Sequence, residues 1–233
     1  MYKGIRRVQL MVHIGIIPDG NRRWYKKQHN IMTALQDIWM KITLTIFDTI
    51  ANINNSKYKQ LSDICEISIY ICSIDNLNRT DGTNDIIYNF IRKLWKEVSN
   101  VTTNKNIQAI LEPTQINIVG DIEIVPNDIQ SILQNLSVRK ENPRCTVNLA
   151  LAYDYNKDMI NYGVGNIASY NRSQSNIDMV FRCGGENRTS GFFPTKTIYS
   201  EWFFNDKLWP DITLHDIDNV IKEYKQRNRR FGK

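Results

Sequence analysis

Two segments far apart in this chain combine arginines, glycines and carboxylates in patterns suited to binding phosphate. The first spans residues 13–24 (H-I-G-I-I-P-D-G-N-R-R-W) and the second residues 182–190 (R-C-G-G-E-N-R-T-S). Each places arginines and a glycine-containing turn after an apolar run, and the first adds Asp19, a carboxylate that can hold a divalent cation. One site built from both segments would bind one diphosphate or two.

In the first segment, Asp19, Gly20 and Asn21 open a predicted helix, so that backbone N–H groups would face a bound phosphate. Arg22 and Arg23 would add charge-assisted hydrogen bonds. A carboxylate among these cations would repel a phosphate unless Mg²⁺ bridged them, which makes Asp19 the predicted metal ligand. Alternatively, Asp19 only caps the helix and the arginines form a solvated face, a reading that this segment fits when taken alone.

In the second segment, Arg182 and Arg188 flank a flexible glycine turn and are followed by Ser190. This arrangement can enclose a second diphosphate, and Glu201 lies downstream as a further carboxylate for the metal. The alternative is an ordinary turn in which Glu186 and Arg188 form a surface ion pair, which would contribute little to stability.

The pattern of the whole chain predicts one α/β domain, residues 1–233, with a central, mostly parallel sheet flanked by helices. Apolar runs rich in β-branched residues predict strands at residues 12–17, 64–71, 115–119, 145–152, 177–181 and 201–204. Spacings of three and four predict helices at residues 31–53, 85–98, 127–138, 156–169 and 214–228. Ligands bind at the carboxyl ends of strands in such sheets, where both arginine segments and the polar turn 73–79 are expected.

Charge and cysteine usage narrow the class of protein. The 233 residues include 30 Lys and Arg against 24 Asp and Glu, a net charge of +6 that suits an anionic ligand, a membrane surface or nucleic acid. The four cysteines form no C-x-x-C pair, and the three histidines do not cluster near them, which argues against a zinc site or a disulfide framework. No apolar run approaches the roughly 18 residues that a transmembrane helix needs. We expect a cytoplasmic protein, with peripheral contact with a membrane left open.

These segments, in this order, resemble the cis-prenyltransferases, a family that includes the undecaprenyl and dehydrodolichyl diphosphate synthases. The resemblance covers nearly the whole chain. It rests on residues 13–27, 69–79, 116–121, 147–153, 179–190, 199–211 (Y-S-E-W-F-F-N-D-K-L-W-P-D) and 227–232 (R-N-R-R-F-G).

The resemblance implies condensation of isopentenyl diphosphate with an allylic diphosphate such as farnesyl or geranyl diphosphate, with Mg²⁺ as cofactor and a new Z double bond in the product. It also implies an apolar tunnel for the growing chain. By the resemblance, the catalytic residues are Asp19 and Asn76, the second at the position assigned to proton removal, and the metal ligands are Asp19 and Glu201. The substrate-binding residues would be Gly20, Asn21, Arg22, Arg23, Trp24, Gln36, Ser73, Asp75, Arg79, Arg182, Arg188 and Ser190.

Several positions depart from the family's bacterial pattern. Met32 and Gln36 stand where the family has an arginine and a histidine, and further changes occur at Ile74, Leu77 and Asn187. Loss of a cation and of a titratable group near the diphosphate should weaken binding or slow turnover. In addition, Ile71 is bulkier than the small residue often found there, which predicts a short or medium product.

The competing function is a non-catalytic or weakly active partner subunit of a heteromeric cis-prenyltransferase. Retention of Asp19, Asn21, Arg23 and the second arginine segment favours an enzyme. A nucleic-acid-binding domain would need aromatic residues interleaved with Lys and Arg along a groove, and only the basic end of the chain offers a candidate, so no nucleic acid is expected. The resemblance implies a homodimer, with a heteromer as the alternative.

Overall fold

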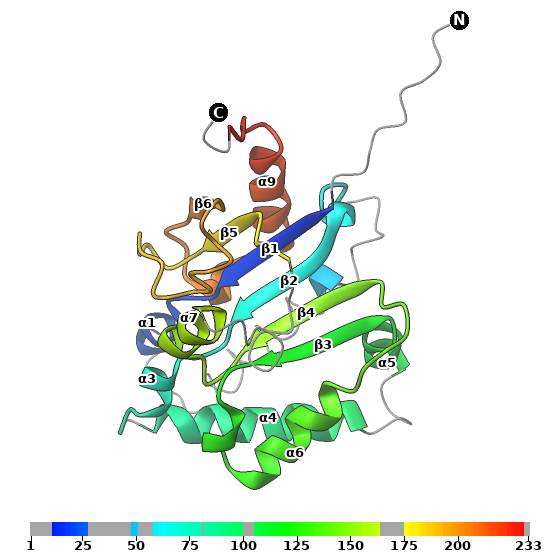
Figure 1. Ribbon diagram of the computed structural model, residues 1–233, viewed down its shortest axis with the longest axis vertical. Helices are drawn as coiled ribbons and strands as arrows, with labels where there is room; N and C mark the ends of the chain where they lie inside the picture. The colour runs from blue at the N-terminus through cyan, green and yellow to red at the C-terminus, as the bar shows by residue number, and fades with distance from the viewer. Residues whose placement is uncertain are drawn as a thin grey trace, which may run out of the picture.

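The sheet of this protein is six-stranded and parallel, in the order β3-β4-β2-β1-β5-β6 (Figure 1). The computed structural model describes residues 11–27, 48–50, 58–80, 82–99, 105–163 and 175–230. Within them the strands are β1 (Val12–Ile17), β2 (Ile64–Tyr70), β3 (Thr114–Val119), β4 (Cys145–Ala150), β5 (Met179–Arg182) and β6 (Glu201–Phe204). The predicted α/β class and all six predicted strands are confirmed, with ends that differ by up to two residues.

The helices of the described residues lie on both faces and at one end of the sheet. They are α1 (Asn21–Lys27), α3 (Ile74–Leu77), α4 (Thr83–Ser99), α5 (Lys105–Leu111), α6 (Asn127–Leu136), α7 (Tyr155–Gly163) and α9 (Leu214–Tyr224). Short 3-10 turns occur at Leu61–Asp63, Ile122–Ile124 and Trp209–Asp211. Most of the long helix predicted at 31–53 lies outside the described residues, and α3 and α5 were not predicted.

Apolar side chains of alternate strand positions build the two sides of the core. One face presents Ile14, Ile16, Ile67 and Ile69, which belong to a buried cluster with residues of α9. On the opposite face, Phe192 and Phe193 of the loop after β5 form part of a separate cluster with Ile17, Val119, Ala150, Tyr153 and Val180. The sheet is thus buried on both sides, as the continuous apolar strands predict.

Among the helices that the structure describes, none combines the length and the hydrophobicity of a membrane-spanning segment.

Candidate functional site: two arginine loops at the carboxyl ends of the strands

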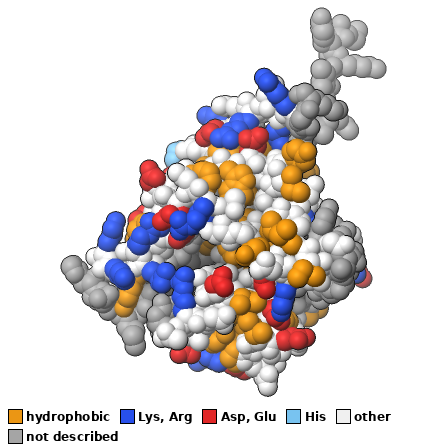
Figure 2. Space-filling view, turned by 60° about the vertical axis from the view of Figure 1, so that its left-hand side comes forward, with side chains coloured by type: hydrophobic (Ala, Val, Ile, Leu, Met, Phe, Trp, Pro, Cys, Tyr) orange, Lys and Arg blue, Asp and Glu red, His pale blue; other side chains and the backbone are white. Residues whose placement is uncertain are grey.

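Three loops meet where the strands end. The turn after β1 holds Asp19, the second arginine segment starts at the last residue of β5, and the loop after β2 holds Ser73. These strands are neighbours in the order β2-β1-β5. Ile17 lies in register with Arg182, so the first two loops leave the sheet at the same level. Figure 1 shows α1, α3 and α7 gathered at this end of the sheet, and Figure 2 shows Lys and Arg side chains on the face that this end presents.

The turn after β1 is fixed by its own hydrogen bonds. The Asp19 N–H donates to the Ile17 carbonyl (2.9 Å), and the Gly20 N–H donates to Asp19 Oδ1 (2.6 Å). Gly20 has φ 94°, in the region that favours glycine. Asn21 then begins α1, and its Nδ2 donates to the Pro18 carbonyl (2.7 Å). The prediction that a helix opens at this point is confirmed.

Arg182 joins the two arginine segments. Its Nη2 donates to Asp19 Oδ2 (2.7 Å), and its Nη1 donates to Ser190 Oγ (2.8 Å) and to the Arg188 carbonyl. The residue is only 2% exposed, and its Nε is buried without a hydrogen-bond partner among the described residues. A buried N–H donor without an acceptor is uncommon, and here it lies in the site where an anion is expected.

Two consecutive glycines let the second loop approach the first. Gly184 has φ 89°, and a Cβ atom there would lie 2.9 Å from Arg23 Nη2 and 3.1 Å from Asp19 Cβ. The Gly184 N–H donates to the Lys207 carbonyl (2.7 Å), while the Trp209 N–H donates to the Asp19 carbonyl (2.9 Å). The L-W-P-D stretch that follows β6 therefore supports both loops from behind.

Exposed cations surround this buried contact. Arg23 lies 3.7 Å from Asp19 Oδ1 and 3.6 Å from Glu186, and Arg188 lies 2.5 Å from the same glutamate. The side chains of Arg23 and Arg188 are 47% and 63% exposed. Ion pairs this exposed are weak, so a multiply charged anion can displace Glu186 from both arginines at little cost.

The third loop holds Asn76 in an unexpected way. Ser73 and Asn76 form a capping box at the start of α3: Ser73 Oγ accepts from the Asn76 N–H (3.2 Å), and Asn76 Oδ1 accepts from the Ser73 N–H (3.3 Å). The side-chain oxygen of Asn76 is therefore occupied by the backbone. Tyr70 at the end of β2 links this loop to the second arginine segment, because its Oη donates to the Ser190 carbonyl (3.3 Å). Asp75 lies in the first turn of this short helix, and Arg79 follows the helix.

Within one chain, Glu201 does not lie beside Asp19, its predicted partner in the metal site. It is the first residue of β6 and lies in register with Met179, the first residue of β5, whereas Asp19 lies beyond the carboxyl end of the sheet. Glu201 instead accepts from Arg227 (2.9 Å), whose guanidinium stacks 4.0 Å over the Phe203 ring. The carboxylate thus anchors the basic end of the chain.

Two other predicted contacts have different outcomes. Trp24 donates from Nε1 to Asp211 Oδ1 (2.9 Å), which fixes α1 against the 3-10 turn at Trp209–Asp211. Gln36 lies outside the described residues, as does Met32.

The donor set suits Mg²⁺ only as an ion shared with a phosphate ligand. Across the described residues, no three His, Cys, Asp or Glu side chains are grouped so as to hold a metal. Mg²⁺ is commonly held by one or two carboxylates together with substrate phosphates and water, and a carboxylate can accept more hydrogen bonds or metal contacts than the two that Asp19 makes here. The site fits a cation that arrives with a diphosphate.

Cys183 lies directly behind the two loops, so the reactivity of its thiol indicates whether the loops stay together. Its thiol contacts the carbonyls of Ile17 (3.5 Å) and Asp19 (3.3 Å), and burial raises its pKa to about 12. Burial also raises the pKa of Cys72 to about 11 and of Cys145 to about 12. Because only the thiolate is nucleophilic, these thiols should be inert near neutral pH.

We expect iodoacetamide at pH 8 to label these three cysteines at least about 100-fold more slowly in the folded protein than in urea. Cys65, which is less deeply buried, serves as the internal comparison in the same mass spectra. Rapid labelling of Cys183 without unfolding would mean that the two loops separate in solution.

A sequence model of one family, described as "Putative undecaprenyl diphosphate synthase", matches residues 17–232. The chain belongs to this family. Membership in the cis-prenyltransferases accounts for the conjunction of the D-G-N-R-R turn with the R-C-G-G-E-N-R loop at one end of the sheet, and it confirms the resemblance inferred from the motifs.

Relatives match over nearly their whole lengths. The chain is 29% identical over 235 residues to an isoprenyl transferase of Fusobacterium nucleatum, covering 94% of this chain and 95% of that protein. It is 25% identical over 251 residues to a tritrans,polycis-undecaprenyl-diphosphate synthase (geranylgeranyl-diphosphate specific) of Pyrobaculum aerophilum, covering 97% and 98%.

Two solved structures share the fold. Lavandulyl diphosphate synthase from Lavandula x intermedia, in complex with dimethylallyl diphosphate, has a TM-score of 0.70 at 22% identity, covering 97% of this chain and 99% of that one. A probable undecaprenyl diphosphate synthase from Campylobacter jejuni has a TM-score of 0.67 at 20% identity, covering 96% and 99%. These likenesses confirm the cis-prenyltransferase architecture.

Proposed function

We propose that this protein condenses isopentenyl diphosphate with an allylic diphosphate, farnesyl or geranyl, to give a Z-polyprenyl diphosphate. The observation that carries the proposal is the contact between Asp19 and Arg182, which joins two cation-bearing loops into one site at the carboxyl ends of the strands. A site for one phosphate would not need both loops, whereas a reaction between two diphosphates needs a binding loop for each.

The allylic diphosphate would lie on the turn of Gly20, Asn21, Arg22 and Arg23. In the reaction the allylic C–O bond breaks, a C–C bond forms to isopentenyl diphosphate, and a proton leaves the new chain to restore a double bond. Negative charge develops on the departing diphosphate, and preorganised cations that face it stabilise the transition state. Arg23, whose side chain is 47% exposed, would supply such a charge.

Isopentenyl diphosphate would lie against Arg188 and Ser190, with Arg182 holding that loop to Asp19. Because Asn76 Oδ1 accepts from the backbone and an amide is a weak base, we assign Asn76 an orienting role. The departing diphosphate would accept the proton. Mg²⁺ bound by Asp19 would neutralise charge on the allylic diphosphate when substrate is present.

The test is incubation of the purified protein with labelled isopentenyl diphosphate, Mg²⁺ and either geranyl or farnesyl diphosphate, with products resolved by length. A ladder of Z-prenyl diphosphates would establish the activity and the preferred primer. If the folded protein makes no product with either primer, the proposal fails for the isolated chain, and co-expression with candidate partners then tests the heteromeric subunit.

We further propose that the working assembly is a homodimer and that any contact with a membrane is peripheral.

Product length should depend on Ile71. This side chain is partly buried and packs against both the cluster with α9 and the cluster beneath α4 and α6, where an apolar tunnel would pass. We expect Ile71→Ala to shift the main product to longer chains by at least one isoprene unit, because removing three carbons deepens the tunnel floor. The chain lengths are read by chromatography of the dephosphorylated products.

The control is Val180→Ala, a core truncation on β5 within the cluster on the opposite face. It should lower the melting temperature and leave product length unchanged. If Ile71→Ala leaves the product distribution unchanged, the tunnel does not end at this residue.

A further inference from the structure

His13 is buried at the centre of a polar network that the reaction site does not use. It lies on β1, is 3% exposed, and is one of three histidines in the chain. Its Nε2 lies 2.8 Å from Ser68 Oγ on β2, and its Nδ1 lies 2.9 Å from Ser175 Oγ, before β5. Glu66 of β2 accepts from Ser175 and lies 3.6 Å from the same ring nitrogen.

The network continues across the sheet to the far edge. Asn148 on β4 donates to Ser68 Oγ (3.1 Å) and to Glu66 Oε1 (2.6 Å), and Asn117 on β3 donates to Asn148 Oδ1 (2.9 Å). Asn148 and Ser68 are 0% and 1% exposed. Hydrogen bonds between buried side chains on adjacent strands fix the lengthwise position of each strand, because a slip would leave polar groups unsatisfied.

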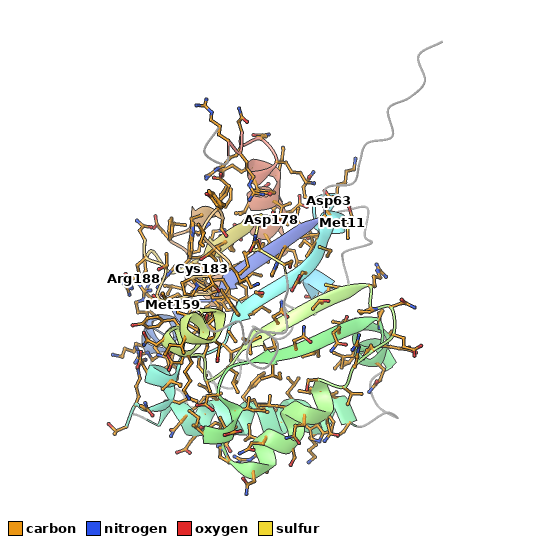
Figure 3. The ribbon with its side chains drawn as sticks, in the orientation of Figure 1. Met11, Asp63, Met159, Asp178, Cys183 and Arg188 are labelled. Atoms are coloured by element: carbon orange, nitrogen blue, oxygen red, sulfur yellow. The ribbon has the colours of Figure 1, made fainter. Side chains whose placement is uncertain are left out.

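The backbone of His13 adds a second tie, to β5. Its N–H donates to Asp178 Oδ2 (3.0 Å), its carbonyl accepts from the Asp178 N–H (3.0 Å), and Asp178 Oδ1 accepts from Arg229 (2.8 Å). Asp178 and Cys183 lie at opposite ends of β5, and Figure 3 shows Arg188 of the reaction site on the Cys183 side. The network therefore lies toward the opposite end of the strands from the site.

From this geometry we propose that His13 is a positioning residue that sets the lengthwise stagger of β1, β2 and β5. These strands carry the three loops of the site, so their stagger decides how Asp19, Arg182 and the Ser73 loop face one another. The inference rests on the proposed function and deepens it. A misplacement of about 1 Å between two reacting groups can cost about 100-fold in rate.

The role requires neutral His13. Burial lowers its pKa below the ordinary value of 6.5, and Lys196 acts in the same direction, while Glu66 and Asp178 oppose the shift. Arg229 holds Asp178 from the C-terminal segment. Because the unfolded chain binds this proton more readily, the contribution of His13 to stability is complete above pH 6.5 and is lost as pH falls below it.

The experiment compares His13→Gln with His215→Gln, which replaces an exposed histidine on α9. For each variant we would measure kcat and KM for both substrates and the melting temperature from pH 5 to 8. The amide signals of Gly20 and Gly184 in ¹H–¹⁵N spectra would report the positions of the two loops. We expect His13→Gln to lower kcat at least about 10-fold with each KM within about threefold of the wild type, to shift both glycine signals, and to remove part of the acid-side loss in melting temperature. His215→Gln should match the wild type.

Ser175→Ala is the milder variant if His13→Gln does not fold, because it keeps His13 and removes one partner. It should lower kcat by a smaller factor and shift the same two signals. Unshifted glycine signals in a folded variant, or wild-type kcat, would overturn the positioning role. If the wild type makes no product, the proposed function fails, while the glycine signals and the pH dependence still decide the role of His13.

Discussion

Asp19→Asn should abolish prenyl transfer, with kcat/KM reduced by about 1,000-fold or more. The substitution keeps the size of the side chain and removes the negative charge that faces Arg182 at 2.7 Å and that would hold Mg²⁺ on the allylic diphosphate. Without this charge, the metal is no longer placed on the leaving group and Arg182 loses its carboxylate partner. Both losses act on the transition state.

The matched control is Asp128→Asn, which breaks an Asp–Arg pair of similar chemistry between α6 and Arg92 of α4. That pair is exposed and far from the loops, so activity should stay within about twofold of the wild type. Raising Mg²⁺ should restore none of the activity of Asp19→Asn. Activity above a tenth of the wild type in a folded Asp19→Asn protein would remove Asp19 from the metal site.

The sequence was sufficient for the sheet and insufficient for its short helices. β1 is buried along its whole length and reads as an almost continuous apolar run, and the aromatic run of β6 is rich in strand-forming residues, so both were predicted with their observed bounds. The helix α3 was not predicted because it has only four residues and depends on a capping box between Ser73 and Asn76. That box is visible in the sequence as S-I-D-N, a serine followed three residues later by a residue able to return the bond.

For the site, the residue types were predictable and their pairing was not. Asp19 follows β1 and Arg182 ends β5, and these strands are neighbours only because β1 is inserted between β2 and β5, an order that no local pattern specifies. The position of Glu201 within one chain could have been inferred from the sequence. A residue that begins a parallel strand lies at the amino edge, opposite the edge where ligands bind.

The His13 network was missed although it left a signal. His13, Ser68, Asn117 and Asn148 are each a polar residue between two apolar neighbours in a strand, a position that is costly when buried unless a partner is present. Four such residues on neighbouring strands indicate a shared network across the sheet.

Gly184→Ala should reduce both stability and activity, and by more than any glycine substitution that only strains the backbone. Gly184 has φ 89°, where a Cβ atom costs about 1–3 kcal/mol. In addition, the new Cβ would lie 3.0 Å from the Asp19 carbonyl carbon and 3.1 Å from Asp19 Cβ, backbone and near-backbone atoms that cannot rotate away. We expect a total loss of about 3 kcal/mol or more, and about 100-fold in kcat as Asp19 is displaced.

Gly82→Ala separates strain from contact. Gly82 has φ 77°, close to that of Gly184, but a Cβ there meets nothing within 4 Å. It should therefore lose only the strain energy, about 1–3 kcal/mol, and keep its activity. Urea unfolding and initial rates for both variants give the two quantities. Because the backbone strain is matched, a larger loss of rate in Gly184→Ala measures how closely the second loop must approach Asp19, and equal rates in the two variants would mean that this approach is not needed for catalysis.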